Sequence, residues 1–292
     1  MTDATLMRGR PLADDLRART SERLGVLRSR GVTPTLGTVL MSDDEADEAF
    51  MDKKHDTCKE VGISTKRVDV PPDAPAEELY RAVERLGADE DVTALFVQVP
   101  LPEHVDERAV RNRVPPAKDV DCFAPVNLGR LVVGSPRVTP ATPAAVLRLL
   151  AAYDVETAGR DVVIVGRNTA ICKPLANLLL ARGSGGDATV TVCHTATTDL
   201  PAKTRDAEIL VTAAGAPRLI DGSMVSAGVS VVDISVNRVE TDDDKGYKLV
   251  GDVDFEGVRK KASAITPVPG GVGPLTLELI LHNVVEATER QA

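Results

Sequence analysis

Cysteine, aromatic residues and long apolar runs are all scarce in this chain of 292 residues. The cysteines form no C-x-x-C pair, which argues against a zinc site and against the disulfide framework of a small secreted protein; they are Cys58, Cys122, Cys172 and Cys193. No segment approaches the ~20 consecutive apolar residues of a membrane-spanning helix. Residues 1–4 lack the pattern of a signal peptide. We therefore expect a cytoplasmic protein with no metal and no membrane partner.

Positive charge is also in short supply. Lysine and arginine total 35 against 44 aspartates and glutamates, so the net charge is −9. This balance disfavours nucleic acid as a partner, although local arginines or backbone N–H groups can still bind a small anion. The apolar content of 43% supports real hydrophobic cores, and the length allows two domains.

Helical and strand-like patterns alternate along the first half, which predicts parallel strands covered by helices. The predicted helices are 11–29, 45–61 and 76–87, and the predicted strands are 35–41, 65–70 and 92–99. The Thr/Pro-rich segment 139–143 marks the expected domain boundary, and a helix at 144–153 follows.

The second half has the order of a nucleotide-binding βαβ unit. Its predicted elements are a strand that runs into a turn at 161–167, strands at 188–193, 209–213 and 229–236, and a helix at 173–182. We therefore predict an α/β protein of two domains, residues 1–143 and a Rossmann-type domain at 144–274. The final helix, within 275–292, is expected to pack back on the first domain.

The turn that ends segment 161–167 keeps only Gly166 of the G-x-G-x-x-G fingerprint, which by itself is weak evidence. Arg167 follows the glycine, and the next strand ends in Cys193-His194-Thr195 without the carboxylate that usually binds the ribose of NAD. Arg167 and the Thr195 hydroxyl could instead receive a 2′-phosphate. NADP is therefore favoured over NAD; the alternative is that Arg167 is a solvated surface charge.

Lys54 shares one face of the predicted helix 45–61 with Phe50 at i−4 and Cys58 at i+4. A lysine on such a stripe either extends its amine to solvent or is buried. Burial would lower its pKa and suit it to proton transfer near neutral pH. The adjacent Lys53 and His55 are expected to be solvated.

Two further segments place polar groups beside predicted strands. Gln98 ends a buried strand, at the edge where ligands of parallel sheets bind, unless it only caps local backbone. Asp119 and Asp121 lie at i and i+2 in a non-helical stretch. Asp121 could bind the N–H groups of a heterocycle, or the pair could serve only as turn chemistry.

The segment 269–276, PGGVGPLT, has three glycines and two prolines ahead of a helical pattern at 277–289. Such a composition indicates a rigid loop whose backbone can approach a ligand closely. An ordinary Gly/Pro turn is the alternative.

Together these segments resemble the bifunctional 5,10-methylenetetrahydrofolate dehydrogenase/methenyltetrahydrofolate cyclohydrolase family over nearly the whole chain. The matching pieces are VQVPLP at 97–102, KDVD at 118–121, NLGRL at 127–131, VGRNTAICKP at 165–174, TVTVCHT at 189–195, NR at 237–238, GDVDF at 251–255 and PGGVGPLT at 269–276.

The resemblance implies roles for particular residues. Lys54 would handle the proton, Gln98 would orient it, and Asp121 would bind the pterin. The other implied folate-binding residues are Phe50, Pro100, Leu101, Pro269, Gly270, Gly271, Gly273 and Thr276. The implied cofactor-binding residues are Gly166, Arg167, Asn168, His194, Thr195, Ala214, Gly215 and Val236.

The family fold has a folate-binding catalytic domain and an NADP-binding domain with a cleft between them, and the family enzyme is a homodimer. Its activity implies tetrahydrofolate substrates, one-carbon metabolism and a link to purine biosynthesis. Hydride transfer to NADP needs no protein base, whereas hydrolysis of the methenyl product to 10-formyltetrahydrofolate needs proton transfer by Lys54, held by Gln98.

This chain departs from the family pattern at several positions. Phe50 replaces the usual tyrosine, Asn168 a common serine, and Cys122, Cys172 and Ser235 usual glycines. Loss of the tyrosine hydroxyl motivates an alternative in which the dehydrogenase persists and the cyclohydrolase is weak. A dehydrogenase of a different substrate class, such as shikimate, and a paralogue that binds folate or NADP without turnover are the competing hypotheses.

Overall fold

The computed structural model describes residues 3–241 and 246–292 and divides into two compact units. Unit 1 comprises the described part of Met1–Asp14 together with Thr142–Thr276. Unit 2 comprises Asp15–Ala141 and Leu277–Ala292. The chain passes between the units within three helices, α1 (Arg10–Ser29), α6 (Ala141–Ala152) and α10 (Val272–Glu289).

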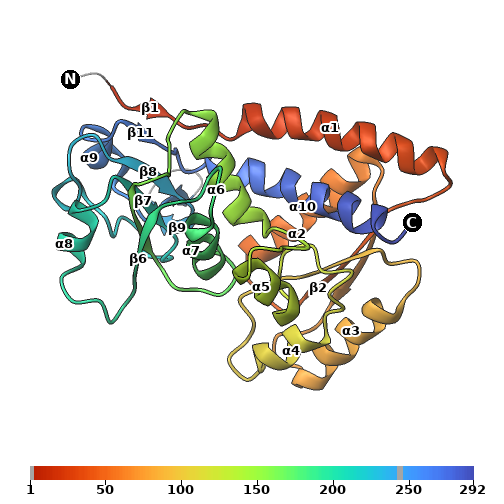
Figure 1. Cartoon of the computed structure of the whole chain (residues 1–292). Coiled ribbons are helices and arrows are strands. Elements are labelled where there is room, and N and C mark those ends of the chain that lie inside the picture. Colours follow the sequence, from red (N-terminus) through yellow and green to blue (C-terminus); the bar gives the residue numbers. More distant parts are fainter. Residues whose placement is uncertain (1–2, 242–245) are drawn as a thin grey trace. The chain divides into compact units, whose positions relative to one another are not determined.

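Unit 2 is built on a parallel sheet of three strands in the order β3-β2-β4. Figure 1 labels its central strand β2 and the helices α3, α4 and α5 of the same unit. The strands are β2 (Thr35–Leu40), β3 (Ser64–Asp69) and β4 (Ala94–Val97), and the helices are α2 (Glu45–Val61), α3 (Ala76–Ala88), α4 (Glu107–Arg113) and α5 (Pro125–Val132). Every residue of the central strand β2 is buried. Apolar side chains of α3, including Leu79 and Val83, pack with Val39 and Leu95 of the sheet in one core.

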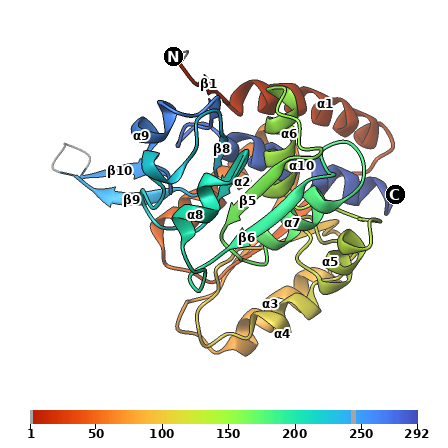
Figure 2. The same cartoon turned by 60° about the vertical axis from the view of Figure 1, so that its left-hand side comes forward.

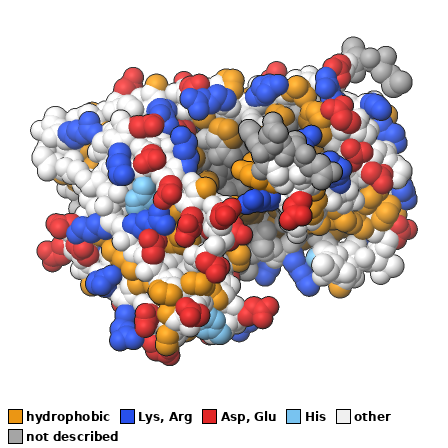
Figure 3. All heavy atoms as spheres, turned by 180° about the vertical axis from the view of Figure 1, so that it is seen from behind, with side chains coloured by type: hydrophobic (Ala, Val, Ile, Leu, Met, Phe, Trp, Pro, Cys, Tyr) orange, Lys and Arg blue, Asp and Glu red, His pale blue; other side chains and the backbone are white. Residues whose placement is uncertain are grey.

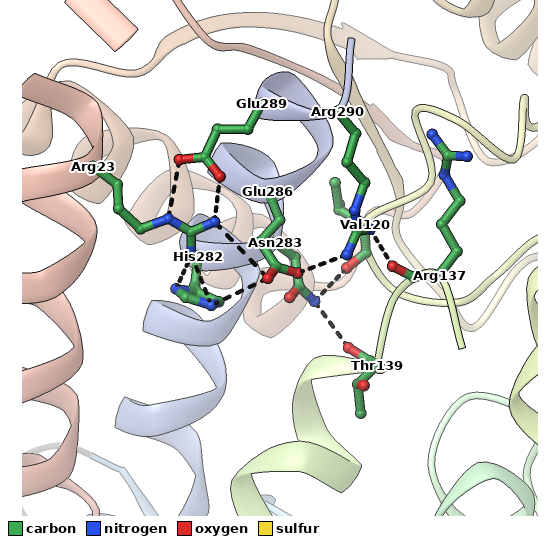
Figure 4. A network of polar contacts seen from close by, with 9 residues as sticks. All are labelled: Arg23, Val120, Arg137, Thr139, His282, Asn283, Glu286, Glu289 and Arg290. Atoms are coloured by element: carbon green, nitrogen blue, oxygen red, sulfur yellow. Dashed lines mark hydrogen bonds and ion pairs between the residues drawn. The ribbon is translucent and has the colours of Figure 1, made fainter. Parts of the chain in front are cut away.

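The C-terminal helix is attached to unit 2 by polar contacts. Arg17 of α1 bonds Glu278 of α10, and Arg23 bonds Glu289 further along. Asn283 donates to the carbonyl oxygens of Val120 at 2.8 Å and Thr139 at 2.9 Å (Figure 4). Residues 277–292 therefore belong to the unit that contains residues 15–141.

Unit 1 contains a parallel sheet of six strands in the order β1-β11-β8-β7-β5-β6. The strands are β1 (Thr5–Leu6), β5 (Asp161–Val165), β6 (Thr189–Cys193), β7 (Ile209–Thr212), β8 (Ser230–Asp233) and β11 (Ala264–Ile265). The other elements are α7 (Cys172–Leu180), α8 (Leu200–Arg205), the 3₁₀ turn η1 (Gly222–Met224), α9 (Phe255–Arg259) and the antiparallel hairpin β9 (Asn237–Glu240) with β10 (Tyr247–Val250). Figure 2 shows this hairpin projecting from the rest of the unit.

The parallel strand order places β6 and β7 on opposite sides of β5. A ligand site is expected beyond the carboxyl ends of strands at such a reversal of strand order. The predicted α/β class and Rossmann-type arrangement are thus confirmed.

The elements agree closely with the predicted ones where the sequence pattern is strong. Helix α2 has the predicted limits, because Asp44 caps its first turn and Gly62 ends it with φ 82°. The strand predicted at 92–99 is shorter, Ala94–Val97, since burial continues beyond the hydrogen-bonded ladder. The two-residue strands β1 and β11 were missed, because two residues carry no detectable alternation.

The N-terminal segment differs from the predicted domain assignment. Residues 1–143 were predicted as one domain, but β1 pairs with β11 in the sheet of unit 1. The remaining domain limits stay a prediction.

Acidic and basic side chains are interspersed over the face shown in Figure 3, with hydrophobic ones between them. Within residues 3–241 and 246–292, no helix is both long and apolar enough to cross a membrane.

Candidate functional site

Lys54 lies in the middle of α2, and its side chain is completely buried. Its Nζ is 3.2 Å from the ring centroid of Phe96 on β4 and 4.7 Å from that of Phe50 on its own helix. Among the described residues, Nζ has no hydrogen-bond partner. The structure thus decides against a solvent-extended side chain: an amine is held in an aromatic, water-poor environment.

Burial lowers the pKa of Lys54 to about 7, and the nearby carboxylates of Asp121 and Asp47 oppose this change. Asp121 shows the converse behaviour. Loss of solvent raises its pKa to about 7, while the hydrogen bond that its Oδ1 accepts from the Ala141 N–H, 2.7 Å long, favours the anion. An acid and a base therefore titrate in the same pH range within unit 2, as proton exchange at neutral pH requires.

Gln98 was predicted to hold Lys54, and the structure shows a different arrangement. Its Nε2 donates to Asp47 Oδ1 at 2.9 Å and to the Val99 carbonyl oxygen at 3.1 Å. No hydrogen bond joins the described atoms of Gln98 and Lys54. The Gln98 Oε1 atom is buried and unpartnered.

The KDVD segment forms a loop organised by Asp119. This buried carboxylate accepts hydrogen bonds from the backbone N–H groups of Asp121, Phe123 and Ala124 and from Asn127 Nδ2. The turn-chemistry interpretation therefore applies to Asp119, whereas the Asp121 side chain accepts a hydrogen bond from outside this loop, from the Ala141 N–H. Cys122 lies in the left-handed region at φ 57°, where the family's usual glycine is more readily accommodated.

His55 was expected to be solvated, and this was wrong. The residue is buried, and its Nε2 lies 2.8 Å from Thr38 Oγ1 on β2. The helix buries a wider face than the Phe50-Lys54-Cys58 stripe, so the position after Lys54 also faces the sheet. Lys53 is exposed, as predicted.

The predicted folate-binding segments have constrained backbones. Pro100 and Pro269 each follow a cis peptide bond, and Gly270 has φ 112°. A Cβ on Gly271 would lie 2.7 Å from Thr266 Cβ and 2.8 Å from the Pro267 carbonyl oxygen. A constrained backbone is therefore present at 269–271, but the predicted limits were wrong. Helix α10 begins at Val272 rather than 277, because Pro274 is tolerated in the first turn of a helix.

The remaining folate-binding predictions differ in exposure. Space around Gly273 is open. Leu101 is partly exposed, and Thr276 is buried with its hydroxyl donating to the Val272 carbonyl. Contact of these residues and of 269–271 with a folate stays a prediction.

The predicted cofactor turn in unit 1 is closely packed at Gly166. This residue has φ 134°, and a Cβ there would lie 2.5 Å from the Ala213 carbonyl oxygen and 2.7 Å from Cys172 Sγ. The side chain of Asn168 accepts from the N–H groups of Ile171 and Cys172 and thereby caps α7. Its predicted contact with a cofactor would thus have to coexist with this capping role.

Arg167 and Thr195 lie two residues beyond paired strand ends. Val165 of β5 is opposite Cys193 of β6 in a parallel ladder, so both segments leave the sheet at the same edge. Both residues are exposed, and within the described residues Arg167 has no hydrogen bond or ion pair. His194 Nδ1 instead accepts from the Ala196 N–H in the local turn.

Sequence reasoning gave no role to Asp252, the residue that organises the loop after β7. Its buried carboxylate accepts hydrogen bonds from the N–H groups of Ala214, Gly215 and Ala216, from Ser235 Oγ and from Asn237 Nδ2. Ser235 therefore joins the network that positions the predicted residues Ala214 and Gly215, while Val236 beside it is exposed. The sequence feature that could have identified Asp252 is the segment GDVDF at 251–255, in which two aspartates follow a short strand.

Comparison with known proteins gives matches along the chain. The family model for the catalytic domain of tetrahydrofolate dehydrogenase/cyclohydrolase matches residues 7–121, and the model for its NAD(P)-binding domain matches 140–292. A "Bifunctional protein FolD" of Haloquadratum walsbyi is 50% identical over 287 residues, which cover 98% of this chain and 92% of the relative. The protein of that name from Natronomonas pharaonis is 51% identical, with 97% and 95% covered.

Solved structures agree with these sequence matches. The bifunctional enzyme FolD, methylenetetrahydrofolate dehydrogenase/cyclohydrolase, of Campylobacter jejuni has a TM-score of 0.90 and 37% identity, over 99% of this chain and 100% of that chain. A Trypanosoma brucei N5,N10-methylenetetrahydrofolate dehydrogenase-cyclohydrolase, complexed with NADP cofactor and inhibitor, has a TM-score of 0.92 and 36% identity, over 100% and 99%.

Proposed function

This chain belongs to the tetrahydrofolate dehydrogenase/cyclohydrolase family, and on that premise we propose that it catalyses both family reactions. It oxidises 5,10-methylenetetrahydrofolate to 5,10-methenyltetrahydrofolate with NADP, and it hydrolyses that product to 10-formyltetrahydrofolate. Relatives named as bifunctional are about half identical over nearly all of this chain. This identity, together with the catalytic residues described above, favours retention of both activities over a binding-only paralogue.

The buried, unpartnered amine of Lys54 is the observation that carries the proposal. In the hydrolysis, water attacks the cationic bridging carbon and loses a proton. The bond from this carbon to one ring nitrogen then breaks, that nitrogen takes up a proton, and the remaining hydroxyl loses its proton as the formyl group forms. With a pKa of about 7, Lys54 exists partly as a neutral amine that can accept the proton lost by the water. We assign Asp121, whose pKa is also about 7, to the pterin and to the same proton exchange.

Unit 1 offers a suitable cradle for NADP. At Gly166 the turn between β5 and α7 packs against Ala213 and Cys172 so closely that no side chain would fit, and its φ of 134° favours glycine. Arg167 and Thr195 are exposed at one sheet edge and are assigned to the 2′-phosphate, whereas Ala214 and Gly215, held by Asp252, are assigned to the nicotinamide side. NADP, when bound, supplies the acceptor for the hydride.

The remaining parts of the proposal rest on family membership. We assign Phe50, Pro100, Leu101 and the loop 269–276 to the folate. We also propose a cytoplasmic homodimer whose 10-formyl product serves purine biosynthesis. Sedimentation of the purified protein tests the dimer, and a monomer would refute that part alone.

Two parallel assays with purified protein test the function. The first follows loss of the methenyl chromophore of 5,10-methenyltetrahydrofolate against the uncatalysed rate. The second follows reduction of NADP in the presence of 5,10-methylenetetrahydrofolate. Catalysis of both supports the bifunctional enzyme.

The remaining outcomes distinguish the competing functions. NADP reduction without accelerated ring opening would show a dehydrogenase that lacks an effective cyclohydrolase, as the missing hydroxyl at Phe50 suggests. Tight folate or NADP binding with neither reaction would show a binding paralogue.

A further inference from the structure

Asp47 connects two elements of the proposed ring-opening site. It lies in the first turn of α2, seven residues before Lys54, and the helical repeat places the two on the same face. Its Oδ1 accepts from Gln98 Nε2 at 2.9 Å, and its Oδ2 accepts from Ser42 Oγ at 2.8 Å. We propose that Asp47 is a positioning residue that fixes the orientation of the Gln98 amide for ring opening, an inference that rests on the proposed function.

The geometry of Gln98 shows what this contact achieves. One amide hydrogen is bonded to Asp47 and the other to the Val99 carbonyl, so Oε1 is the only amide atom left for another partner. Oε1 is buried and unpartnered, as is Lys54 Nζ.

The strand geometry places Gln98 on the Lys54 side of the sheet. The Gln98 N–H continues the ladder by donating to the Val39 carbonyl. Because side chains alternate along a strand, Gln98 leaves the same face as Phe96, whose ring contacts Lys54 Nζ. Oε1 is therefore the acceptor available to the lysine or to a proton of the attacking water.

A carboxylate is suited to this task because it only accepts hydrogen bonds. Asp47 can pair with Nε2 but not with Oε1, so it selects one of the two orientations of the glutamine amide. An asparagine at position 47 can pair with either end. Loss of the carboxylate would therefore allow the amide to rotate and present N–H groups where an acceptor is needed.

Asp47→Asn tests the inference, and Glu48→Gln is the matched control. Both substitutions remove one negative charge from the first turn of α2, but the side chain of Glu48 is exposed and forms no hydrogen bond or ion pair with the described residues. We expect Asp47→Asn to lower the rate of ring opening about tenfold, the effect of one lost orienting hydrogen bond. Glu48→Gln should remain within about twofold of the parent chain.

A double-mutant cycle with Gln98→Ala separates positioning from a general effect on the helix. If Asp47 acts through Gln98, Asp47→Asn causes no further loss in the Gln98→Ala background. Multiplicative losses would overturn the inference. NADP reduction, measured in the same preparations, should be retained, because hydride transfer needs no proton transfer.

Ser42→Ala supplies a second variant if Asp47→Asn does not fold. It removes the other hydrogen bond of Asp47, and a smaller loss of ring opening that vanishes in the Gln98→Ala background supports the inference. A loss that persists there contradicts it.

The single variants Lys54→Met and Gln98→Ala distinguish failure of the proposed function from failure of the positioning role alone. Wild-type ring opening by Lys54→Met or Gln98→Ala would refute the catalytic assignment itself. If both variants lose ring opening, and Asp47→Asn lowers the rate independently of Gln98→Ala, only the positioning role is refuted.

Discussion

Replacing Lys54 by methionine should stabilise the protein while it removes ring opening. The lysine pKa falls from 10.5 to about 7 on burial, a change that corresponds to about 5 kcal/mol of unfavourable free energy at neutral pH. Methionine has a similar length and needs no charge. Because Asp121 loses its neighbouring cation and offsets part of the gain, we expect the free energy of unfolding to rise by about 3 kcal/mol at pH 7.

The pH dependence identifies the cause. Between pH 10.5 and about 7 the unfolded chain binds a proton at Lys54 that the folded chain does not, so stability falls as the pH decreases. Below pH 7 the cost is complete, and above pH 10.5 it is absent. The stability difference between Lys54→Met and the parent chain should therefore shrink to about 1 kcal/mol at pH 10.

Urea unfolding at pH 7 and pH 10, with two spectroscopic probes to establish two-state behaviour, measures this difference. In parallel, ring opening by the variant should fall about 10²- to 10⁴-fold, the range for a lost proton-transfer group, while NADP reduction is partly retained. A variant less stable than the parent at pH 7, or a difference that is the same at both pH values, would refute the burial argument. Equal loss of both activities would contradict the role of Lys54 in ring opening alone.

Three further substitutions test other parts of the site. Phe50→Tyr restores a hydroxyl on the ring whose centroid is 4.7 Å from Lys54 Nζ. The rate of ring opening should increase several-fold without a change in NADP reduction. An unchanged rate in the methenyl assay would show that Phe50 is a tolerated substitution. Arg167→Ala should raise the KM for NADP at least about tenfold and leave the KM for NAD unaltered, since only NADP carries the 2′-phosphate. Parallel increases in KM for both cofactors would count against the assignment. Asp252→Ala leaves the amides of Ala214, Gly215 and Ala216 without their acceptor. The free energy of unfolding, measured by urea titration, should therefore fall by about 3 kcal/mol or more. A change below about 1 kcal/mol would mean that water replaces the carboxylate.

Local sequence patterns were sufficient for the main elements. Helix α2 was predicted with its limits because its cap, its apolar stripe and its terminal glycine are all within one short segment. The same stripe identified Lys54. The glycine density of 269–276 indicated a constrained backbone, which the structure has at 269–271, whereas helix α10 already begins at Val272. The assigned roles came from resemblance to a family, since residue spacing alone is equally compatible with a purely structural role for Lys54, Gln98 and Asp121.

Other features depended on partners far apart in the chain. The sequence could not show that Gln98 would bond Asp47, that His55 would meet Thr38, or that Asp252 would gather the amides after β7. Each of these contacts exists because a strand end or helix face meets a distant segment, and hydrogen-bond geometry is decided only at that meeting.

The chain by itself therefore determined which groups are present, where the helices and longer strands form, and which faces are apolar. Tertiary structure decided how those groups behave. Lys54 is an ordinary lysine in the unfolded chain and titrates near pH 7 only because folding surrounds it with Phe96, Phe50 and the rest of unit 2. Removal of water, which no local pattern specifies, is the physical reason for the difference.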